Sequence, residues 1–127
     1  MNGRCMCGAV TFTVEGALRP VVNCHCHRCR RWSGHYWAAS GAPTERVSIS
    51  GGTTLRWFSP ADGVEYGFCS TCGSSLFWRN DAPPELISFS AGCLDQPTGL
   101  TTSHQLWMAE HGDYHEPLSA PESREFE

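Results

Sequence analysis

Eight cysteines are the residues of this chain best suited to chemistry, and seven of them lie in three tight groups. The groups are an N-terminal pair, Cys5-x-Cys7, a trio, Cys24-x-Cys26-x-x-Cys29, and a knuckle, Cys69-x-x-Cys72. Thiolates one or two residues apart can bind one metal ion, and soft sulfur ligands select zinc or iron–sulfur clusters. Four protein ligands suit a closed structural zinc, whereas three leave a position open for water or substrate. Seven ligands therefore indicate one zinc that holds the fold and one that does chemistry.

The knuckle runs into Gly73, which lets the backbone fold around the two sulfurs with amide N–H groups pointing at them. Such a turn supplies half of a zinc site, and the spacing leaves two pairings open. In the first, the N-terminal pair completes this site and the trio binds a second ion. In the second, the knuckle pairs with the last two cysteines of the trio, and the cysteines left over need Cys93 or a histidine. We prefer the first pairing, because it keeps each compact group on one ion.

Three arginines, Arg28, Arg30 and Arg31, lie within or just after the trio. Three thiolates on Zn²⁺ carry about one excess negative charge, which these guanidinium groups would offset. Arg also binds carboxylates in bidentate fashion, so the same residues are candidates to contact an acidic substrate. The simpler interpretation of each is a solvated surface charge.

Histidines offer either a fourth ligand or an acid–base group beside the trio. His25 and His27 are possible fourth ligands, although their position next to the trio cysteines makes simultaneous ligation sterically awkward. A thiol reaction also needs a group that moves a proton, and His25, His27, His35 and His104 are candidates, none of them uniquely marked. We interpret the lone Cys93 as a small buried hydrophobe rather than a ligand.

Short strands separated by turns must position these groups. Alternation and β-rich composition predict strands over residues 10–14, 46–50, 54–58, 65–68, 75–79, 86–91 and 104–108. Gly51-Gly52 is expected to close a hairpin between the second and third of these strands, and the knuckle forms a hairpin tip between the fourth and fifth. The best helical candidate is one short turn at residues 27–32. Frequent Gly and Pro turns predict an all-β domain of small sheets.

Length and charge restrict the class of protein. The chain of 127 residues suffices for one domain, placed at residues 1–119, followed by an acidic, loosely ordered tail at 120–127. A net charge of −4 disfavours nucleic acid as a partner, and no apolar run approaches the ~20 residues of a membrane helix. No secretory signal is visible, so we expect a cytoplasmic protein whose close cysteine pairs bind metal. A secreted scaffold with four disulfides is the alternative, but Cys5-x-Cys7 is too tight for an easy mutual bridge.

Taken together, the motifs resemble the glutathione-dependent formaldehyde-activating enzyme family, also called the centromere protein V family. The resemblance rests on four segments in the family's order, which run across about residues 3 to 108. They are Cys5-Met6-Cys7-Gly8-Ala9-Val10, Cys24-His25-Cys26-His27-Arg28-Cys29 followed by Ser33-Gly34, Phe68-Cys69-Ser70-Thr71-Cys72-Gly73-Ser74-Ser75-Leu76-Phe77, and Gly92-Cys93-Leu94-Asp95.

This resemblance implies a β-tent fold of small antiparallel sheets around zinc. It implies a structural zinc on Cys5, Cys7, Cys69 and Cys72, and a second zinc with an open position on Cys24, Cys26 and Cys29. It also implies a carbon–sulfur lyase or synthase that joins glutathione to formaldehyde reversibly, giving S-hydroxymethylglutathione. Its partners are then a small-molecule thiol and an aldehyde, or their adduct.

The main competing hypothesis is a non-catalytic zinc module whose two metals only hold a binding surface. Trp32, Tyr36 and Trp37 would then form an aromatic contact patch rather than core or pocket wall. The fourth ligand of the trio discriminates the two, because a water or exogenous thiol favours an enzyme and a protein side chain favours a closed site. A thiol redox protein is a weaker third hypothesis, because the βαβ context of thioredoxin-like proteins is absent.

Overall fold

The computed structural model describes residues 1–117 and 122–126. The strands are β1 (Asn2–Arg4), β2 (Thr11–Val14), β3 (Val21–Cys24), β4 (Trp37–Pro43), β5 (Val47–Ser50), β6 (Leu55–Ala61), β7 (Val64–Cys69), β8 (Ser75–Asn80), β9 (Leu86–Ser90), β10 (Thr102–Leu106) and β11 (Glu122–Ser123). The helices are α1 (His27–Ser33) and the 3₁₀ turns η1 (Thr44–Arg46), η2 (Gly52–Thr54), η3 (Ala91–Cys93) and η4 (Met108–Glu110).

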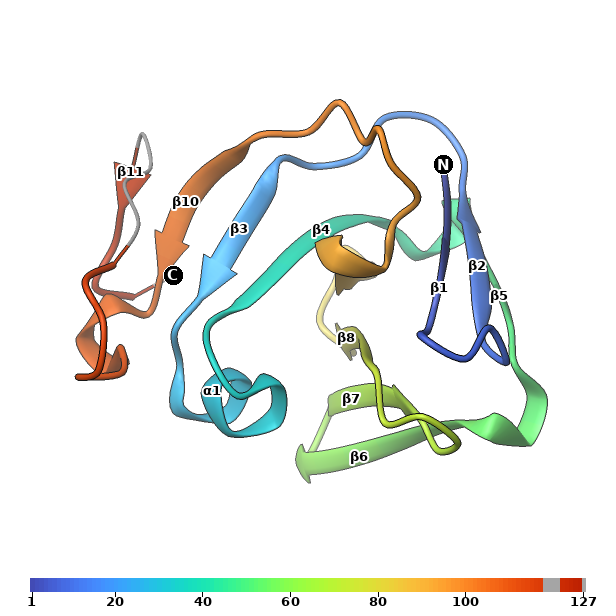
Figure 1. Ribbon diagram of the computed structural model, residues 1–127, viewed down its shortest axis with the longest axis horizontal. Helices are drawn as coiled ribbons and strands as arrows, with labels where there is room; N and C mark the ends of the chain where they lie inside the picture. The colour runs from blue at the N-terminus through green and yellow to red at the C-terminus, as the bar shows by residue number, and fades with distance from the viewer. Residues whose placement is uncertain (118–121, 127) are drawn as a thin grey trace.

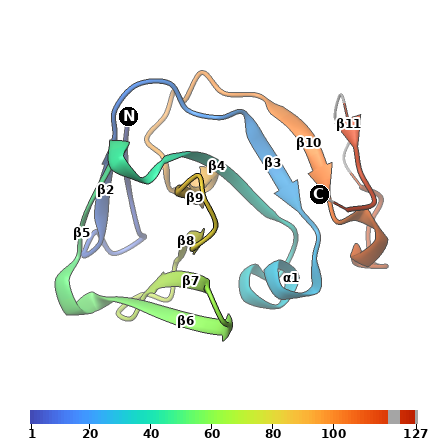
Figure 2. The ribbon, with the colours of Figure 1, turned by 180° about the vertical axis from the view of Figure 1, so that it is seen from behind.

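The strands form two sheets, which confirms the predicted all-β class. The smaller sheet has the order β1-β2-β5, and the larger has the order β11-β10-β3-β4-β9-β8-β7-β6. The smaller sheet is antiparallel throughout, but β10 runs parallel to both β3 and β11, so the larger sheet is mixed. Figures 1 and 2 show the smaller sheet on one side of the molecule and β3 with β10 on the other, with β4 running between them.

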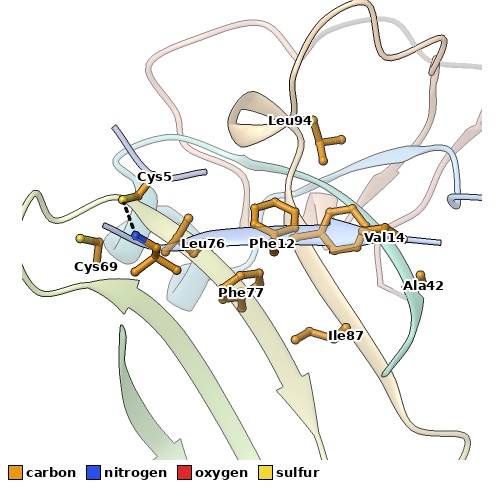
Figure 3. Packing of buried hydrophobic residues seen from close by; sticks show 11 residues of the cluster. Cys5, Phe12, Val14, Ala42, Cys69, Leu76, Phe77, Ile87 and Leu94 are labelled. Carbon is orange, nitrogen blue, oxygen red and sulfur yellow. Dashed lines mark hydrogen bonds between the residues drawn. The ribbon is translucent and has the colours of Figure 1, made fainter. Parts of the chain in front are cut away.

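The main core lies between the smaller sheet and one face of β8 and β9. Phe12 on β2 is buried, and its ring contacts those of Phe77 and Phe89 with centroids 5.1 and 5.5 Å apart. Leu76, Ile87 and other apolar side chains complete this cluster, as Figure 3 shows. The alternation of Ile87 and Phe89 on one face of β9 confirms the expectation for residues 86–91.

The opposite face of the larger sheet carries a second, aromatic cluster. Its buried members are Cys29, Trp37, Ala39 and Tyr66, which come from α1, β4 and β7. Because successive residues of a strand point to opposite faces, β4 places Trp37 and Ala39 in this cluster and Ala42 in the main core. The larger sheet therefore separates the core from the side on which α1 and the trio lie.

Most of the predicted elements are present. The short helix at residues 27–32 is α1, the strand at 10–14 contains β2, and β7 and β8 form the predicted hairpin around the knuckle. The last predicted strand, at 104–108, lies two residues earlier in the structure, as β10. β1, β3 and β4 lack clear alternation and were not predicted.

The hairpin predicted across Gly51-Gly52 is wrong. β5 pairs with β2, opposite Phe12 and Val14, so Val47 and Ile49 pack against the main core. β6 pairs instead with β7 in the larger sheet. Gly52 adopts φ 52 in η2, and this turn carries the chain from one sheet to the other. Burial of the β5 apolar face against β2 thus outweighs local hairpin closure.

The expected loosely ordered tail at 120–127 stays a prediction, because the structure describes only part of it. Residues 120, 121 and 127 lie outside the described residues. β11 pairs with β10, and the Arg124 backbone N–H donates to the Gln105 carbonyl over 2.9 Å. The Met108 N–H donates in turn to the Arg124 carbonyl over 3.0 Å, so residues 122–124 lie along the edge of the larger sheet. In residues 1–117 and 122–126, no helix is long and apolar enough to cross a membrane.

Candidate metal centres and the adjoining cavity

The N-terminal pair and the knuckle meet in one cluster of four sulfurs. The Sγ atoms of Cys5, Cys7, Cys69 and Cys72 all lie within 4.8 Å of one another. Cys7 Sγ lies 3.6 Å from Cys5 Sγ and 3.7 Å from Cys69 Sγ. Zn–S bonds of about 2.3 Å in a tetrahedron place the sulfurs about 3.8 Å apart, so the cluster fits a zinc ion. All eight cysteines are free, so no disulfide competes for these sulfurs.

Backbone and side-chain donors surround this four-sulfur cluster. The Val10 N–H donates to Cys5 Sγ over 3.3 Å, the dashed line in Figure 3, and the Cys72 N–H donates to Cys69 Sγ over 3.4 Å. The Ser74 hydroxyl lies 3.1 Å from Cys72 Sγ, and hydrogen bonds from this hydroxyl and then from the Ser74 and Cys7 backbone lower the pKa of the Cys72 thiol to about 5. Ser74 also accepts from the Met6 N–H, which ties the two half-sites together. Hydrogen bonds of this kind favour the thiolate form that binds metal.

The trio forms a separate cluster at the start of α1. The Sγ atoms of Cys24, Cys26 and Cys29 lie within 4.8 Å of one another. Cys26 is the N-cap of α1, and its sulfur accepts from the Cys29 N–H over 3.4 Å, as in the knuckle. Gly34 ends the helix in the left-handed conformation, with φ 89, and donates to the Arg30 carbonyl. The sulfurs are thus grouped as in the preferred pairing, while their role as metal ligands stays a prediction.

The three sulfurs of the trio strongly perturb one another. Hydrogen bonds from Cys24 and then Cys29 lower the pKa of Cys26 to about 2. Interaction with Cys26 raises the pKa of Cys24 to about 12, and Cys24, Cys26 and then burial raise that of Cys29. Adjacent negative charges repel one another, so without a counter-charge the raised pKa values of Cys24 and Cys29 favour their protonated thiols. A bound cation would displace those protons, so the donor set suits a soft divalent metal such as zinc.

Within the described ranges, the trio gains no fourth side-chain ligand. His25 is fully buried, and its Nε2 lies 2.6 Å from Gln105 Oε1. His27 is exposed and its Nδ1 lies 3.0 Å from Glu110 Oε1. Cys93 contacts the main core, and its Sγ lies 3.8 Å from the Ser75 carbonyl oxygen. Cys93 is half-buried rather than fully buried as expected, and desolvation raises the pKa of its thiol.

The other two candidate histidines lie in different surroundings. His104 Nδ1 lies 2.6 Å from Ser103 Oγ, and its Nε2 lies 2.9 Å from an Arg124 guanidinium nitrogen. The His35 ring contacts the His115 ring, with centroids 4.3 Å apart. His104 lines the cavity described next, and so does His27.

A cavity of about 690 Å³ opens directly onto the trio. The trio cysteines line it together with Trp37 and Ala39 from β4, Val64 and Tyr66 from β7, and Trp78 from β8. The Tyr66 hydroxyl lies 3.7 Å from Cys29 Sγ, and burial followed by the nearby thiols raises the pKa of this phenol. A raised pKa keeps the phenol protonated at neutral pH, so it can donate a hydrogen bond beside the sulfurs.

The three candidate arginines have different positions. Arg28 is exposed and lines the cavity, so it can meet an acidic group at the opening. Arg30 Nε donates to the Glu110 carbonyl over 2.9 Å, which fixes α1 to η4. Arg31 is exposed and does not line the cavity.

The aromatic residues near the trio do not form an exposed contact patch. Trp37 is only 6% exposed, and its Nε1 donates to Ser90 Oγ over 2.7 Å. Trp32 packs edge-on against Trp37 and Tyr66, with centroids 5.0 and 4.9 Å away. Tyr36 is half-buried beside the ring of His25. Trp37 lines the cavity and Trp32 packs against the aromatic cluster, while Tyr36 lies outside both.

Sequence reasoning missed Ala39, Val64, Tyr66 and Trp78 as pocket residues. Alternation along the strand after residue 63 would place Val64 and Tyr66 on one face. Nothing local indicates that this face lies opposite α1, because that arrangement depends on sheet pairings between distant segments.

Comparisons with known proteins agree with the family resemblance. Residues 1–110 match the family described as glutathione-dependent formaldehyde-activating enzyme. A Halomonas elongata protein, provisionally named a glutathione-dependent formaldehyde-activating enzyme, is 32% identical over 103 residues, which are 75% of this chain and 66% of that protein. The chain thus spans just under two thirds of that relative's length. The crystal structure of a Rhodobacter sphaeroides protein shares the fold, with a TM-score of 0.63 at 24% identity over 80% of this chain and 98% of that one. The chain belongs to the glutathione-dependent formaldehyde-activating enzyme family.

Proposed function

We propose that this protein is a zinc-dependent carbon–sulfur lyase or synthase that makes or breaks a thiol–aldehyde adduct. The observation that carries the proposal is the trio itself, three sulfurs with no fourth described side-chain ligand at the wall of a cavity of about 690 Å³. A closed structural site would have four protein ligands and no need for an adjoining cavity. The family points to S-hydroxymethylglutathione as the type of adduct, with glutathione and formaldehyde as partners, and we expect a cytoplasmic location.

We assign different roles to the two metals. Cys5, Cys7, Cys69 and Cys72 would hold a structural zinc, and Cys24, Cys26 and Cys29 would hold a catalytic one. A zinc ion in the second site would supply a Lewis acid and would lower the pKa of a thiol that occupies its open position.

The reaction is redox-neutral. The thiol loses its proton, its sulfur bonds to the aldehyde carbon, and the carbonyl oxygen takes the electron pair of the broken π bond and then a proton. The Tyr66 O–H lies beside Cys29 Sγ and is kept protonated by burial, so it donates a hydrogen bond to the oxygen as charge develops there. The aromatic walls exclude water and hold the two components together.

The Cys26→Ala variant tests this proposal. Removing one of three sulfurs should leave too little affinity to hold a metal in an open site, so adduct formation should fall by at least about 100-fold. The circular dichroism spectrum and one zinc per chain should remain, because the four-sulfur cluster is intact. Cys93→Ala is the matched control, since its sulfur belongs to neither cluster, and it should keep both metals and the activity. Retained turnover in Cys26→Ala would sink the assignment of the trio as the reactive site.

The alternative of a non-catalytic zinc module becomes the better reading if the zinc-loaded wild type is inert with every thiol and aldehyde tried. Elemental analysis in the same experiment identifies the bound metal. It does not discriminate between the two hypotheses, because both expect zinc in each cluster.

A further inference from the structure

We propose that the cavity beside the trio selects a thiol–aldehyde adduct in which one component carries a bulky apolar group, such as a phenyl group or a medium-length alkyl chain. This inference rests on the proposed function, because it names the substrate class of the same site. The atoms balance as before: the thiol sulfur bonds to the aldehyde carbon, and the thiol proton moves to the oxygen.

The walls of the cavity are apolar where they are most buried. Trp37, Ala39 and Tyr66 are 6%, 2% and 5% exposed, and Val64 and Trp78 pack against them. All five line the cavity. Formaldehyde adds a single carbon, which occupies only a small part of about 690 Å³. An apolar group placed there would displace water from apolar walls, which favours its binding.

The polar atoms of these walls are already engaged. Trp37 Nε1 donates to Ser90 Oγ over 2.7 Å, and the Tyr66 hydroxyl lies at the sulfur end of the cavity, next to Cys29. Of the ionisable residues that line the cavity, His27 and Arg28 are exposed, whereas Arg19, His104 and Glu110 are half-buried. Arg19 is itself engaged, since it donates to the Ala39 carbonyl over 3.3 Å and to Ser88 Oγ over 3.2 Å. A peptide amide or carboxylate against the aromatic walls would lose its water without gaining a partner there. The buried part of the cavity therefore favours an apolar group, and the exposed part accepts a charged one.

Ala39 is the smallest side chain of this apolar wall. Residues 37, 39 and 41 share one face of β4, and there the small side chain of Ala39 follows the large one of Trp37. Ala39 packs in the same buried cluster as Tyr66. A larger side chain at position 39 would occupy the space that we assign to the apolar group. Ala38 points to the opposite face of the same strand and does not line the cavity, so it offers a matched control.

The test measures adduct formation by the zinc-loaded wild type in two arms. One arm fixes glutathione and compares formaldehyde with hexanal and phenylacetaldehyde. The other fixes formaldehyde and compares glutathione with 2-mercaptoethanol and 2-phenylethanethiol. We expect kcat/KM to rise about tenfold or more for the apolar member of at least one arm, and the arm that responds identifies which component carries the group. The dissociation constant measured by quenching of tryptophan fluorescence should likewise be lower for 2-phenylethanethiol than for 2-mercaptoethanol.

Ala39→Leu should reduce the preference for the apolar member by about tenfold, whereas Ala38→Leu should leave that preference unchanged. The preference is the ratio of two kcat/KM values measured on the same variant. A partial loss of folded protein lowers both values equally and leaves the ratio unchanged. Val64→Phe, at a half-exposed wall position, is a second filling variant if Ala39→Leu does not fold. A wild type that is active but prefers glutathione with formaldehyde in both arms overturns this inference and leaves the proposed function standing. A wild type that is inert with every pair overturns both.

Discussion

At the scale of the residue, the two Cys-x-x-Cys turns use the same local device for different ends. In each, the backbone N–H of the second cysteine donates to the sulfur of the first over 3.4 Å. The knuckle acquires two further sulfurs from the N-terminus, whereas the turn from Cys26 to Cys29 acquires one, from Cys24. The spacing of the cysteines predicted each compact group, whose members lie close in sequence, but it left open which groups share one ion.

Tyr66 is a residue whose place beside the trio could not be predicted from the sequence. It lies three positions before Cys69 yet faces Cys29, a residue that is distant along the chain. We predict that Tyr66→Phe lowers kcat for adduct formation by about 10- to 100-fold with little change in KM, because its O–H donates to the oxygen only as charge develops. Steady-state kinetics with zinc quantification checks this, and zinc content should match the wild type. A proportional loss of zinc and activity would instead make Tyr66 a structural support of Cys29.

At the scale of the element, β4 separates two environments and could not be recognised beforehand. Its seven residues lack alternation, because both of its faces are covered. β5 is the opposite case. Its alternation predicted the strand, but the sequence did not identify the strand with which it pairs. The local turn residues favour pairing of β5 with β6 across Gly51-Gly52. β5 pairs with β2 instead, where Ile49 lies opposite Phe12.

The contact of β1 with β2 yields a prediction at this scale. Gly3 lies opposite Phe12, and a Cβ atom built on Gly3 would overlap the Phe12 ring. That ring is 2% exposed and wedged against Phe77 and Phe89, so it cannot move aside freely. Gly3→Ala should therefore lower the free energy of unfolding by about 1–3 kcal/mol.

Gly92→Ala is the control for this substitution. Its added Cβ meets nothing within 4 Å, so the change in free energy of unfolding should stay within about 0.5 kcal/mol. Denaturant midpoints at constant m-value measure both variants. Equal midpoints for the two would show that the smaller sheet adjusts to the added methyl group, against the rigid packing argued here.

At the scale of the whole molecule, the two sulfur clusters differ in what they connect. The four-sulfur cluster joins the loop between β1 and β2 to the β7–β8 hairpin, which belong to different sheets. The trio comes from six consecutive residues at the end of β3 and the start of α1. Sequence spacing predicted the trio and favoured one pairing for the four-sulfur cluster. The cavity beside the trio arises from β4, β7 and β8 brought together by long-range pairing, which no local pattern encodes.

This difference predicts an order of events when metal is removed. Graded chelation should take the trio's metal first, while far-ultraviolet circular dichroism stays unchanged, because an open three-ligand site holds its ion less tightly and ties together only one segment. Removal of the metal in the four-sulfur cluster should then unfold the protein, since it releases the N-terminal strands from the β7–β8 hairpin. Cys69→Ser should likewise lower the melting temperature by more than about 10 °C, and Cys26→Ala by much less. Zinc release followed alongside the spectrum checks the order. Loss of both metals in one step together with unfolding would mean that the trio is also a closed structural site, and the division of labour between the clusters would fall.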